Sequence, residues 1–109
     1  MARTNADQLH GTLDMLVLKC LEIGPQHGYG LATRLQQQSA DVLQVEEGSL
    51  YPALYRMERR GWIAASWGTS DNNRRARFYR LTPAGRRQLR AETRSWQVHV
   101  GAVARILGA

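Results

Sequence analysis

Cysteine and long hydrophobic runs are nearly absent from this 109-residue chain. Cys20 is the only cysteine, so no intramolecular disulfide can form, and its apolar neighbours Leu16, Val17 and Leu21 suggest a core position. No apolar segment approaches the roughly 18 residues of a membrane-spanning helix, and no apolar run precedes a cleavage site near the N-terminus. We therefore expect a cytoplasmic single-domain protein that has one modest core and does not enter a membrane.

The sequence also lacks the pattern of a catalytic or metal site. His10, His27 and His99 show no metal-ligand spacing, and no neighbouring base can be identified for Ser49. His27 stands at an expected helix start, where it is most simply a packing or capping residue. We therefore predict that the chain is not an enzyme and holds neither a metal nor a cofactor.

Lysine is scarce as well, because Lys19 is the only one and arginine carries almost all the positive charge. The formal net charge is +6, and the segment from Arg56 to Arg90 holds ten arginines against two acids, Glu58 and Asp71. A basic field this concentrated implies a polyanionic partner, nucleic acid first and an anionic membrane surface second. The planar guanidinium suits phosphates and guanine edges, although arginine richness can also reflect a GC-rich genome.

Residues 46–61 form the helix around which the rest of the chain is organised. Ser49 suits its N-cap, Pro52 is then tolerated in its first turn, and Gly61 ends it in the left-handed conformation. An apolar stripe faces inward and consists of Leu50, Ala53, Leu54 and Met57. The opposite side offers hydroxyls, phenols and guanidinium groups, which suits a DNA groove, whereas the alternative is an ordinary solvated helix.

The segments on either side of this helix complete a winged helix-turn-helix. Apolar periodicity predicts a helix over 9–23 and a second from His27 to about residue 38, in the order of a helix-turn-helix. After Gly61 the period changes to two, which predicts strands over 63–67 and 78–81 around the polar turn 68–75. A hairpin that ends in arginines and directly follows the helix over 46–61 is typical of a wing. The alternative is an ordinary surface loop.

The last helix begins at Thr82-Pro83-Ala84-Gly85, a cap followed by proline at the first helical position. Its apolar residues are spaced as in a heptad seam: Leu89, Trp96, Val100, Val103 and Leu107. Met15 and Leu18 give the first helix a second apolar face. We expect this face and the seam to meet in a two-fold dimer; alternatively, the last helix folds back on its own domain.

The expected fold is therefore mainly α with a small β-hairpin. A winged helix-turn-helix DNA-binding domain spans residues 1–82, and a C-terminal dimerisation helix spans 83–109. Residues 1–7 are polar and are expected to form a frayed end or an arm.

Four segments, in this order, resemble the PadR family of winged-helix transcriptional regulators: HGYGL at 27–31, EGSLYPAL at 47–54, ERRGWI at 58–63 and RFYRLTPAG at 77–85. The likeness extends from about Leu9 to Gly85, the short last helix is similar to the small subfamily, and residues 46–60 with 72–77 resemble versions common in acidobacteria. This likeness implies a homodimer that binds operator DNA, usually as a repressor. It also implies that in some members a small ligand releases the protein from the DNA.

The resemblance also implies residue roles. Ser49, Tyr51 and Tyr55 would lie at the major groove, and the wing arginines would meet phosphates or the minor groove. With the outer helix arginines and the wing tip, the predicted DNA-binding set is Ser49, Tyr51, Tyr55, Arg56, Arg59, Asn73, Arg74, Arg75 and Arg77.

A ligand site is implied only in part. In drug-sensing members of the small subfamily a tryptophan of the last helix stacks on planar ligands in a pore at the dimer interface. Trp96 falls at the matching place, and Met15 and Lys19 would line the same pore around a small hydrophobic ligand. The alternative for Trp96 is a dimer-core residue. Two rival functions stay open: a multidrug-binding protein with weak DNA affinity, and a winged helix that binds protein, which its charged surface disfavours.

Overall fold

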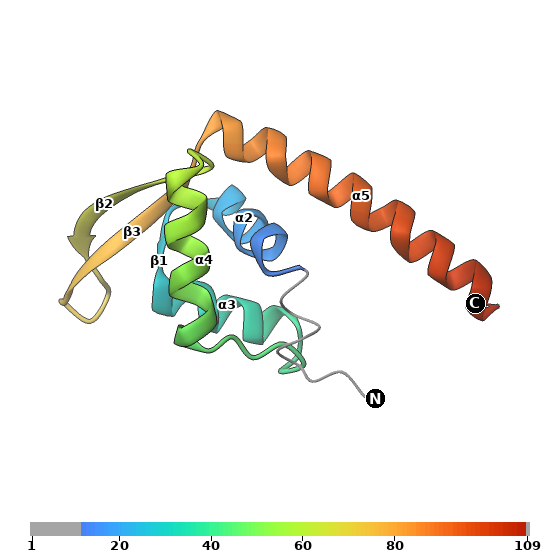
Figure 1. The fold of residues 1–109 in the computed structure, drawn as a ribbon. Helices are drawn as coiled ribbons and strands as arrows, with labels where there is room; N and C mark the ends of the chain where they lie inside the picture. Colours follow the sequence, from blue (N-terminus) through green and yellow to red (C-terminus); the bar gives the residue numbers. More distant parts are fainter. Residues whose placement is uncertain (1–11, 109) are drawn as a thin grey trace.

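The computed structural model describes residues 12–108, and Figure 1 shows their arrangement. Within this range four helices and three strands follow one another: α2 (Leu13–Ile23), β1 (Gln26–His27), α3 (Gly28–Gln38), α4 (Glu47–Arg59), β2 (Ile63–Thr69), β3 (Arg75–Leu81) and α5 (Pro83–Leu107). The expected arm at 1–7, His10 and the first turn of the helix predicted from residue 9 lie outside the described residues. The mainly helical winged helix expected from the sequence is confirmed.

Helix α2 lies at the centre of the core, where it packs against α3, α4, α5 and β3. Val17 and Leu18 are fully buried, and Cys20 is also buried. The expectation that Leu18 belongs to a second face turned toward another subunit is therefore wrong. Because neighbours surround α2 within one chain, most of its apolar surface is covered, although Met15 is only partly buried. Each buried leucine contributes about 1.5–3 kcal/mol.

Helix α4 begins earlier than the sequence indicated. Its N-cap is Glu46, whose backbone is extended, so Ser49 lies within the first turn and is not the cap. Pro52 consequently lies in the second turn, where it cannot donate an N–H to the carbonyl of Gly48. The other end is as expected: Gly61 has φ +76°, and the N–H groups of Gly61 and Trp62 donate to the carbonyls of Glu58 and Met57. These two bonds form a Schellman motif that stops the helix.

The sheet contains a strand that the sequence did not predict. The two-residue β1 pairs with β3, so the antiparallel order is β1-β3-β2, with His27 opposite Phe78. His27 is also the N-cap of α3, because its Nδ1 accepts a hydrogen bond from the N–H of Gly30 at 3.1 Å. The expected capping role of His27 is therefore confirmed. Strands β2 and β3 extend further than expected, which shortens the turn of the wing to residues 70–74.

Thr82 and Gly85 join α5 to the end of α4. The Thr82 hydroxyl accepts from the N–H of Gly85 at 3.0 Å and shares its own hydrogen between the carbonyls of Gly61 and Trp62. Gly85 lies so close to the Trp62 carbonyl that a side chain there would collide with backbone. The start of α5 is thereby fixed to the loop that follows α4.

Helix α5 has an anchored half and a projecting half, as Figure 1 shows. Leu89 is buried in the core of its own chain, so the expectation that it belongs to the seam is wrong. The first half of α5 folds back on α2. Beyond residue 95 the large apolar side chains are exposed, namely Trp96, Val98, Val100, Val103, Ile106 and Leu107. No helix within residues 12–108 is long and apolar enough to cross a membrane.

Candidate nucleic-acid interface

The outer side of α4 presents two tyrosines and an arginine. Tyr55 is 62 % exposed, and the guanidinium of Arg59 lies 5.7 Å from the centroid of its ring. A cation over an aromatic face is attracted by the ring quadrupole, so each side chain restrains the other. Ser49 is exposed on the first turn of the helix. This side of α4 therefore offers two phenols, a hydroxyl and a guanidinium to a partner.

Tyr51 differs from Tyr55 because its ring lies across the start of α3. A Cβ atom added at Gly28 would come within 2.8 Å of the Tyr51 hydroxyl oxygen, so a larger residue would displace the ring from this position. Gly28 is itself buried beneath it. The sequence pair Gly28 and Tyr51 thus holds the N-terminal turns of α3 and α4 together.

The wing is a tight hairpin with a network of its own at the tip. The Ser70 backbone N–H donates to the Arg74 carbonyl at 2.8 Å, and the Ser70 hydroxyl donates to Asn72 Oδ1 at 2.5 Å. Asn73 takes φ +61°, a left-handed conformation that asparagine tolerates better than most residues. Arg74 follows it and is exposed, while the Arg75 guanidinium lies 4.8 Å from the Trp67 ring centroid.

Two of the predicted DNA-contacting arginines take part in ion pairs. Arg56 Nη2 lies 2.6 Å from Asp14 Oδ1 on α2, and Arg77 Nη2 lies 2.8 Å from Glu58 Oε2 on α4. Both pairs join segments that are far apart in the sequence. Beside the second pair, burial raises the pKa of Tyr79, and the Arg77 guanidinium offsets part of that rise.

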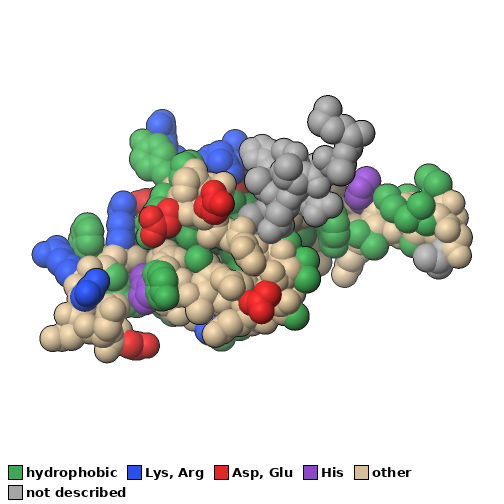
Figure 2. Space-filling model, turned by 90° about the horizontal axis from the view of Figure 1, so that it is seen from below, with side chains coloured by type: hydrophobic (Ala, Val, Ile, Leu, Met, Phe, Trp, Pro, Cys, Tyr) green, Lys and Arg blue, Asp and Glu red, His purple; other side chains and the backbone are tan. Residues whose placement is uncertain are grey.

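The charge is unevenly placed on the surface. Figure 2 shows basic side chains gathered at the end of the molecule that carries the wing, and hydrophobic side chains exposed at the opposite end, on α5. The predicted set of DNA-binding residues is confined to α4 and the wing. An anionic partner and an apolar partner would consequently meet opposite ends of the same chain.

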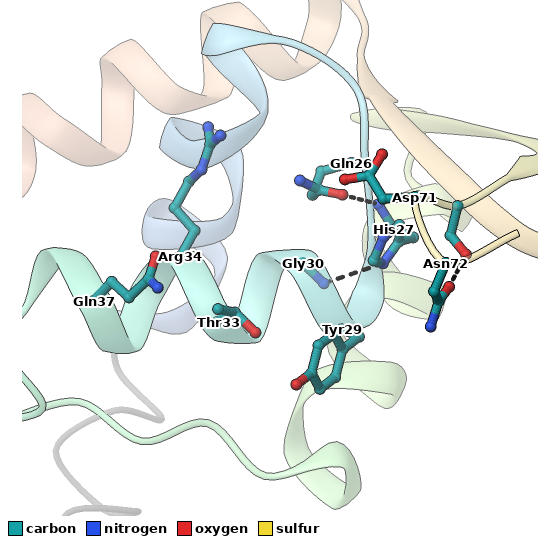
Figure 3. Close-up of a pocket in the computed structure, with 10 residues that line it drawn as sticks. Gln26, His27, Tyr29, Gly30, Thr33, Arg34, Gln37, Asp71 and Asn72 are labelled. Carbon is teal, nitrogen blue, oxygen red and sulfur yellow. Dashed lines mark hydrogen bonds between the residues drawn. The ribbon is translucent and has the colours of Figure 1, made fainter. Parts of the chain in front are cut away.

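A groove of about 390 Å³ separates the wing tip from the outer side of α3 (Figure 3). Its lining is mostly polar: Gln26, His27, Tyr29, Gly30, Thr33, Arg34, Gln37, Ser70, Asp71 and Asn72. His27 is engaged on both sides here, since its backbone N–H donates to Gln26 Oε1 and its Nδ1 accepts from Gly30. Among residues 12–108 no group of histidine, cysteine, aspartate and glutamate side chains could hold a metal ion.

Two exposed aromatic side chains in these regions were not predicted as site residues. Tyr29 stands at the first turn of α3, next to the Gly28 that Tyr51 covers, and Trp67 stands on the wing beneath Arg75. An exposed tyrosine between two glycines at a helix start is a signal that the sequence already contained. The stacking of Trp67 on Arg75 depends on strand register, which the sequence did not fix.

The three residues predicted to line a ligand pore lie on the neighbouring helices α2 and α5. Met15 is partly buried against the core, and Lys19 pairs with Glu22 at 2.7 Å, a hydrogen bond that lowers the pKa of Glu22. Trp96 is 44 % exposed, with its ring centroid 6.2 Å from that of His99. Of these three side chains, only Trp96 therefore has a large exposed apolar surface.

Comparisons with known proteins give a consistent family. Residues 17–91 match the model of the transcriptional regulator PadR-like family. A PadR family transcriptional regulator from Eggerthella lenta is 34 % identical, with a TM-score of 0.78 over 92 % of this chain and 86 % of that one. A PadR-like transcriptional regulator from Bacillus cereus is 28 % identical, with a TM-score of 0.80 over 94 % and 97 %.

A transcriptional regulator from Mycobacterium tuberculosis is 38 % identical over 60 residues, which are 55 % of each chain. The matched region 17–91 contains α3, α4, the wing and the anchored part of α5. The chain therefore belongs to the PadR-like family, and it is a DNA-binding transcriptional regulator with a winged helix, not an enzyme.

Proposed function

We propose that this regulator represses transcription by binding an inverted-repeat operator as a homodimer. The observation that carries the proposal is the pairing of an exposed phenol and guanidinium surface on α4 with a wing that has arginines at its tip. Helix α4 would enter the major groove and the wing would meet phosphates or the minor groove, as in other winged helices. Such a protein would work in the cytoplasm, next to the DNA that it controls.

The proposed DNA contacts differ in kind. Ser49, Tyr51 and Tyr55 would contact base edges or groove walls, and Arg59 and Arg75 would contact phosphates. Arg74 would reach the minor groove from the tip that Asn73 shapes. In Arg56 and Arg77 a carboxylate lies less than 3 Å from Nη2, which offsets part of the charge that each guanidinium could present to a phosphate. Base contacts carry sequence information, and phosphate contacts supply affinity on any sequence.

The proposed dimer would use the projecting half of α5. Trp96, Val100, Val103 and Leu107 lie on one stripe of this helix and are exposed in the single chain. A monomer with an uncovered apolar stripe of this kind would expose it to water at a cost of about 25 cal/mol per Å². Two stripes related by a two-fold axis would cover each other, next to Met15 and Lys19 of α2.

The proposal also includes a small hydrophobic ligand that would release the protein from DNA. The exposed Trp96 ring supports it, because a planar apolar molecule could stack there between two copies of α5. The same exposure supports the alternative that Trp96 only packs in the dimer core.

The test of the proposed function is a titration of the full chain against duplexes selected from a random pool. We expect selection of an inverted repeat whose half-sites are about one helical turn apart, ~34–36 Å. Affinity should fall steeply with salt concentration, since each neutralised phosphate contributes a slope of about 0.9 in log K. Recovery of no preferred sequence, or binding that does not depend on salt, would contradict operator recognition.

A further inference from the structure

We propose that Arg56 is a positioning residue: paired with Asp14, it holds the recognition helix α4 at a fixed angle to α2 and takes no direct part in binding DNA. The inference rests on the operator binding proposed above. It departs from the sequence-based expectation, in which Arg56 and Arg59 were equivalent arginines on the outer side of one helix.

The ion pair has the geometry of a structural contact. Arg56 Nη2 and Asp14 Oδ1 are 2.6 Å apart, a short charge-assisted hydrogen bond across 42 positions of sequence. The Asp14 side chain is only 20 % exposed and that of Arg56 43 %, against 68 % and 41 % for the surface pair of Lys19 and Glu22. Water and salt therefore screen the Arg56 pair less than the surface pair.

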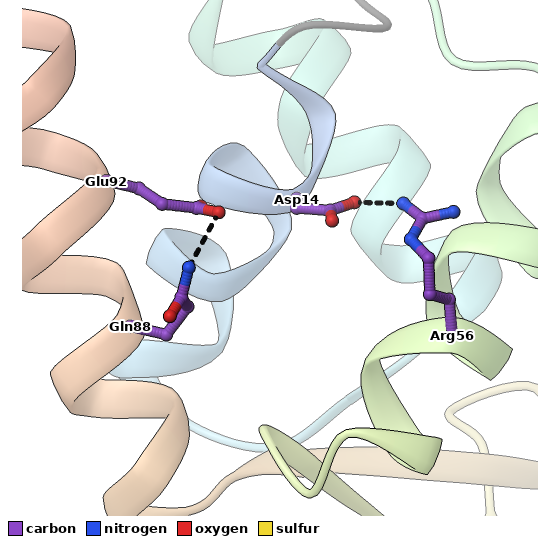
Figure 4. A network of polar contacts seen from close by, with 4 residues as sticks. All are labelled: Asp14, Arg56, Gln88 and Glu92. Carbon is purple, nitrogen blue, oxygen red and sulfur yellow. Dashed lines mark hydrogen bonds and ion pairs between the residues drawn. The ribbon is translucent and has the colours of Figure 1, made fainter.

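Helix α2 is well suited to transmit position because it is fixed on both sides. Its apolar residues are buried between α3, α4 and α5. As Figure 4 shows, Asp14 on one side of α2 meets Arg56 of α4, while Gln88 and Glu92 of α5 lie on the other side. Gln88 donates to Glu92 Oε1 at 3.1 Å, and Glu92 Oε2 is buried with no partner among the described residues.

The order α4, α2, α5 has a consequence for the proposed dimer. In that dimer the two copies of α5 would form the interface, and α2 would connect each α5 to the Arg56 pair on α4. The position of α2 would therefore set the distance between the two copies of α4. A loosened pair should therefore weaken discrimination between correct and incorrect half-site spacing. A lost phosphate contact would instead weaken binding to every duplex by the same factor.

Arg59 is the matched control, because it lies one turn away on the same helix and is also exposed. Within the described chain it has no acidic partner and stacks only on Tyr55. Arg59→Gln should reduce the salt slope of log K by about 0.9, whereas Arg56→Gln should leave the slope at its wild-type value.

The experiment uses the full chain and a duplex selected by the wild-type protein, together with the same duplex lengthened by one base pair between its half-sites and a random duplex. We expect Arg56→Gln and Asp14→Asn each to lower the preference for the selected duplex over the lengthened one by about 5- to 30-fold, with an unchanged salt slope. The double variant Asp14→Arg/Arg56→Asp, which exchanges the charges, should recover most of that preference. Glu22→Gln, which breaks the exposed pair on α2, should change neither quantity.

Two results would overturn the inference: a salt slope reduced by Arg56→Gln as much as by Arg59→Gln, or no recovery in the charge-exchanged variant. If Arg56→Gln fails to fold, Asp14→Asn provides the comparison, since it removes the acidic partner and leaves the Arg56 guanidinium in place. A wild-type chain that selects no duplex would refute the proposed function itself, which separates the two failures.

Discussion

Among the described glycines, Gly85 has the least room for a side chain. A Cβ atom there would collide with the Trp62 carbonyl, which the Thr82 hydroxyl holds in place, and would approach the Leu81 side chain. Gly85→Ala should therefore lower the free energy of unfolding by about 1–3 kcal/mol, the usual cost of overpacking. Urea denaturation measures this change directly.

Gly101 is the control for this prediction, because it lies on the same helix with open space around it. Gly101→Ala should raise the free energy of unfolding by about 0.5–1 kcal/mol through the better helix propensity of alanine. Equal effects of the two substitutions would show that helix propensity, and not the junction with Trp62, governs Gly85.

The buried phenol of Tyr79 should make the free energy of unfolding depend on pH in the alkaline range. Burial raises the pKa of its phenol, so the folded state binds this proton more tightly than the unfolded state does. The associated stability is fully present below the ordinary tyrosine pKa and is lost as pH rises through the raised value. Unfolding measured between pH 8 and pH 11 should show a decline that Tyr79→Phe reduces. Tyr29→Phe, at an exposed ring, should leave the decline unchanged.

At the scale of elements, the tip of the wing carries two arginines in different settings. Arg74 is exposed at the tip, and Arg75 is stacked on Trp67. We expect Arg74→Ala to weaken binding most on operators with A·T-rich flanks, whose narrow minor groove attracts an inserted guanidinium. Arg75→Ala should weaken binding to all flanks alike and reduce the salt slope by about 0.9. Titrations at several salt concentrations would decide, and wild-type behaviour in both variants would remove the wing from the mechanism.

The recognition helix carries the corresponding prediction for sequence preference. Tyr55→Ala should reduce the preference for operator over random DNA more than it reduces total affinity, because we propose that its exposed ring contacts the groove. Competition assays with both duplexes measure the two quantities. Equal losses on both would argue against a specific role for Tyr55.

The elements also show what the sequence could and could not predict. Gly61, the start of α5 at Thr82 and the position of the wing followed from local residue chemistry, and all three are confirmed. Ser49 was wrongly taken as a cap because an extended backbone at Glu46, which no residue type enforces, begins the helix sooner. The two-residue β1 leaves no periodic pattern to detect. The pairing of Arg56 with Asp14 depends on tertiary packing across 42 positions, which no local pattern encodes.

For the whole molecule, the division of α5 into an anchored and a projecting half makes the proposed dimer testable. Val103→Arg would place a charge on the exposed apolar stripe and should convert the proposed dimer to a folded monomer, since the core residues lie elsewhere. Sedimentation velocity measures the change in mass. Val98→Arg, on the other side of the same helix, should leave the dimer intact; dissociation by both or by neither would contradict the proposed interface.

The projecting half of α5 also determines how a movement at one end of this helix affects the other end. From Trp96 to Leu107 it spans about 18 Å, at about 1.5 Å per residue, and none of these residues is buried. Its base is fastened to the end of α4 through Thr82 and Gly85. Because α5 runs about 37 Å from Pro83 to Leu107, a tilt of about 10° at this base moves the far end by about 6 Å. Conversely, a displacement imposed at the far end of α5 would reach α4 only as a small rotation at the Thr82 and Gly85 junction, so we expect changes at Leu107 to move α4 much less than they move the end of α5.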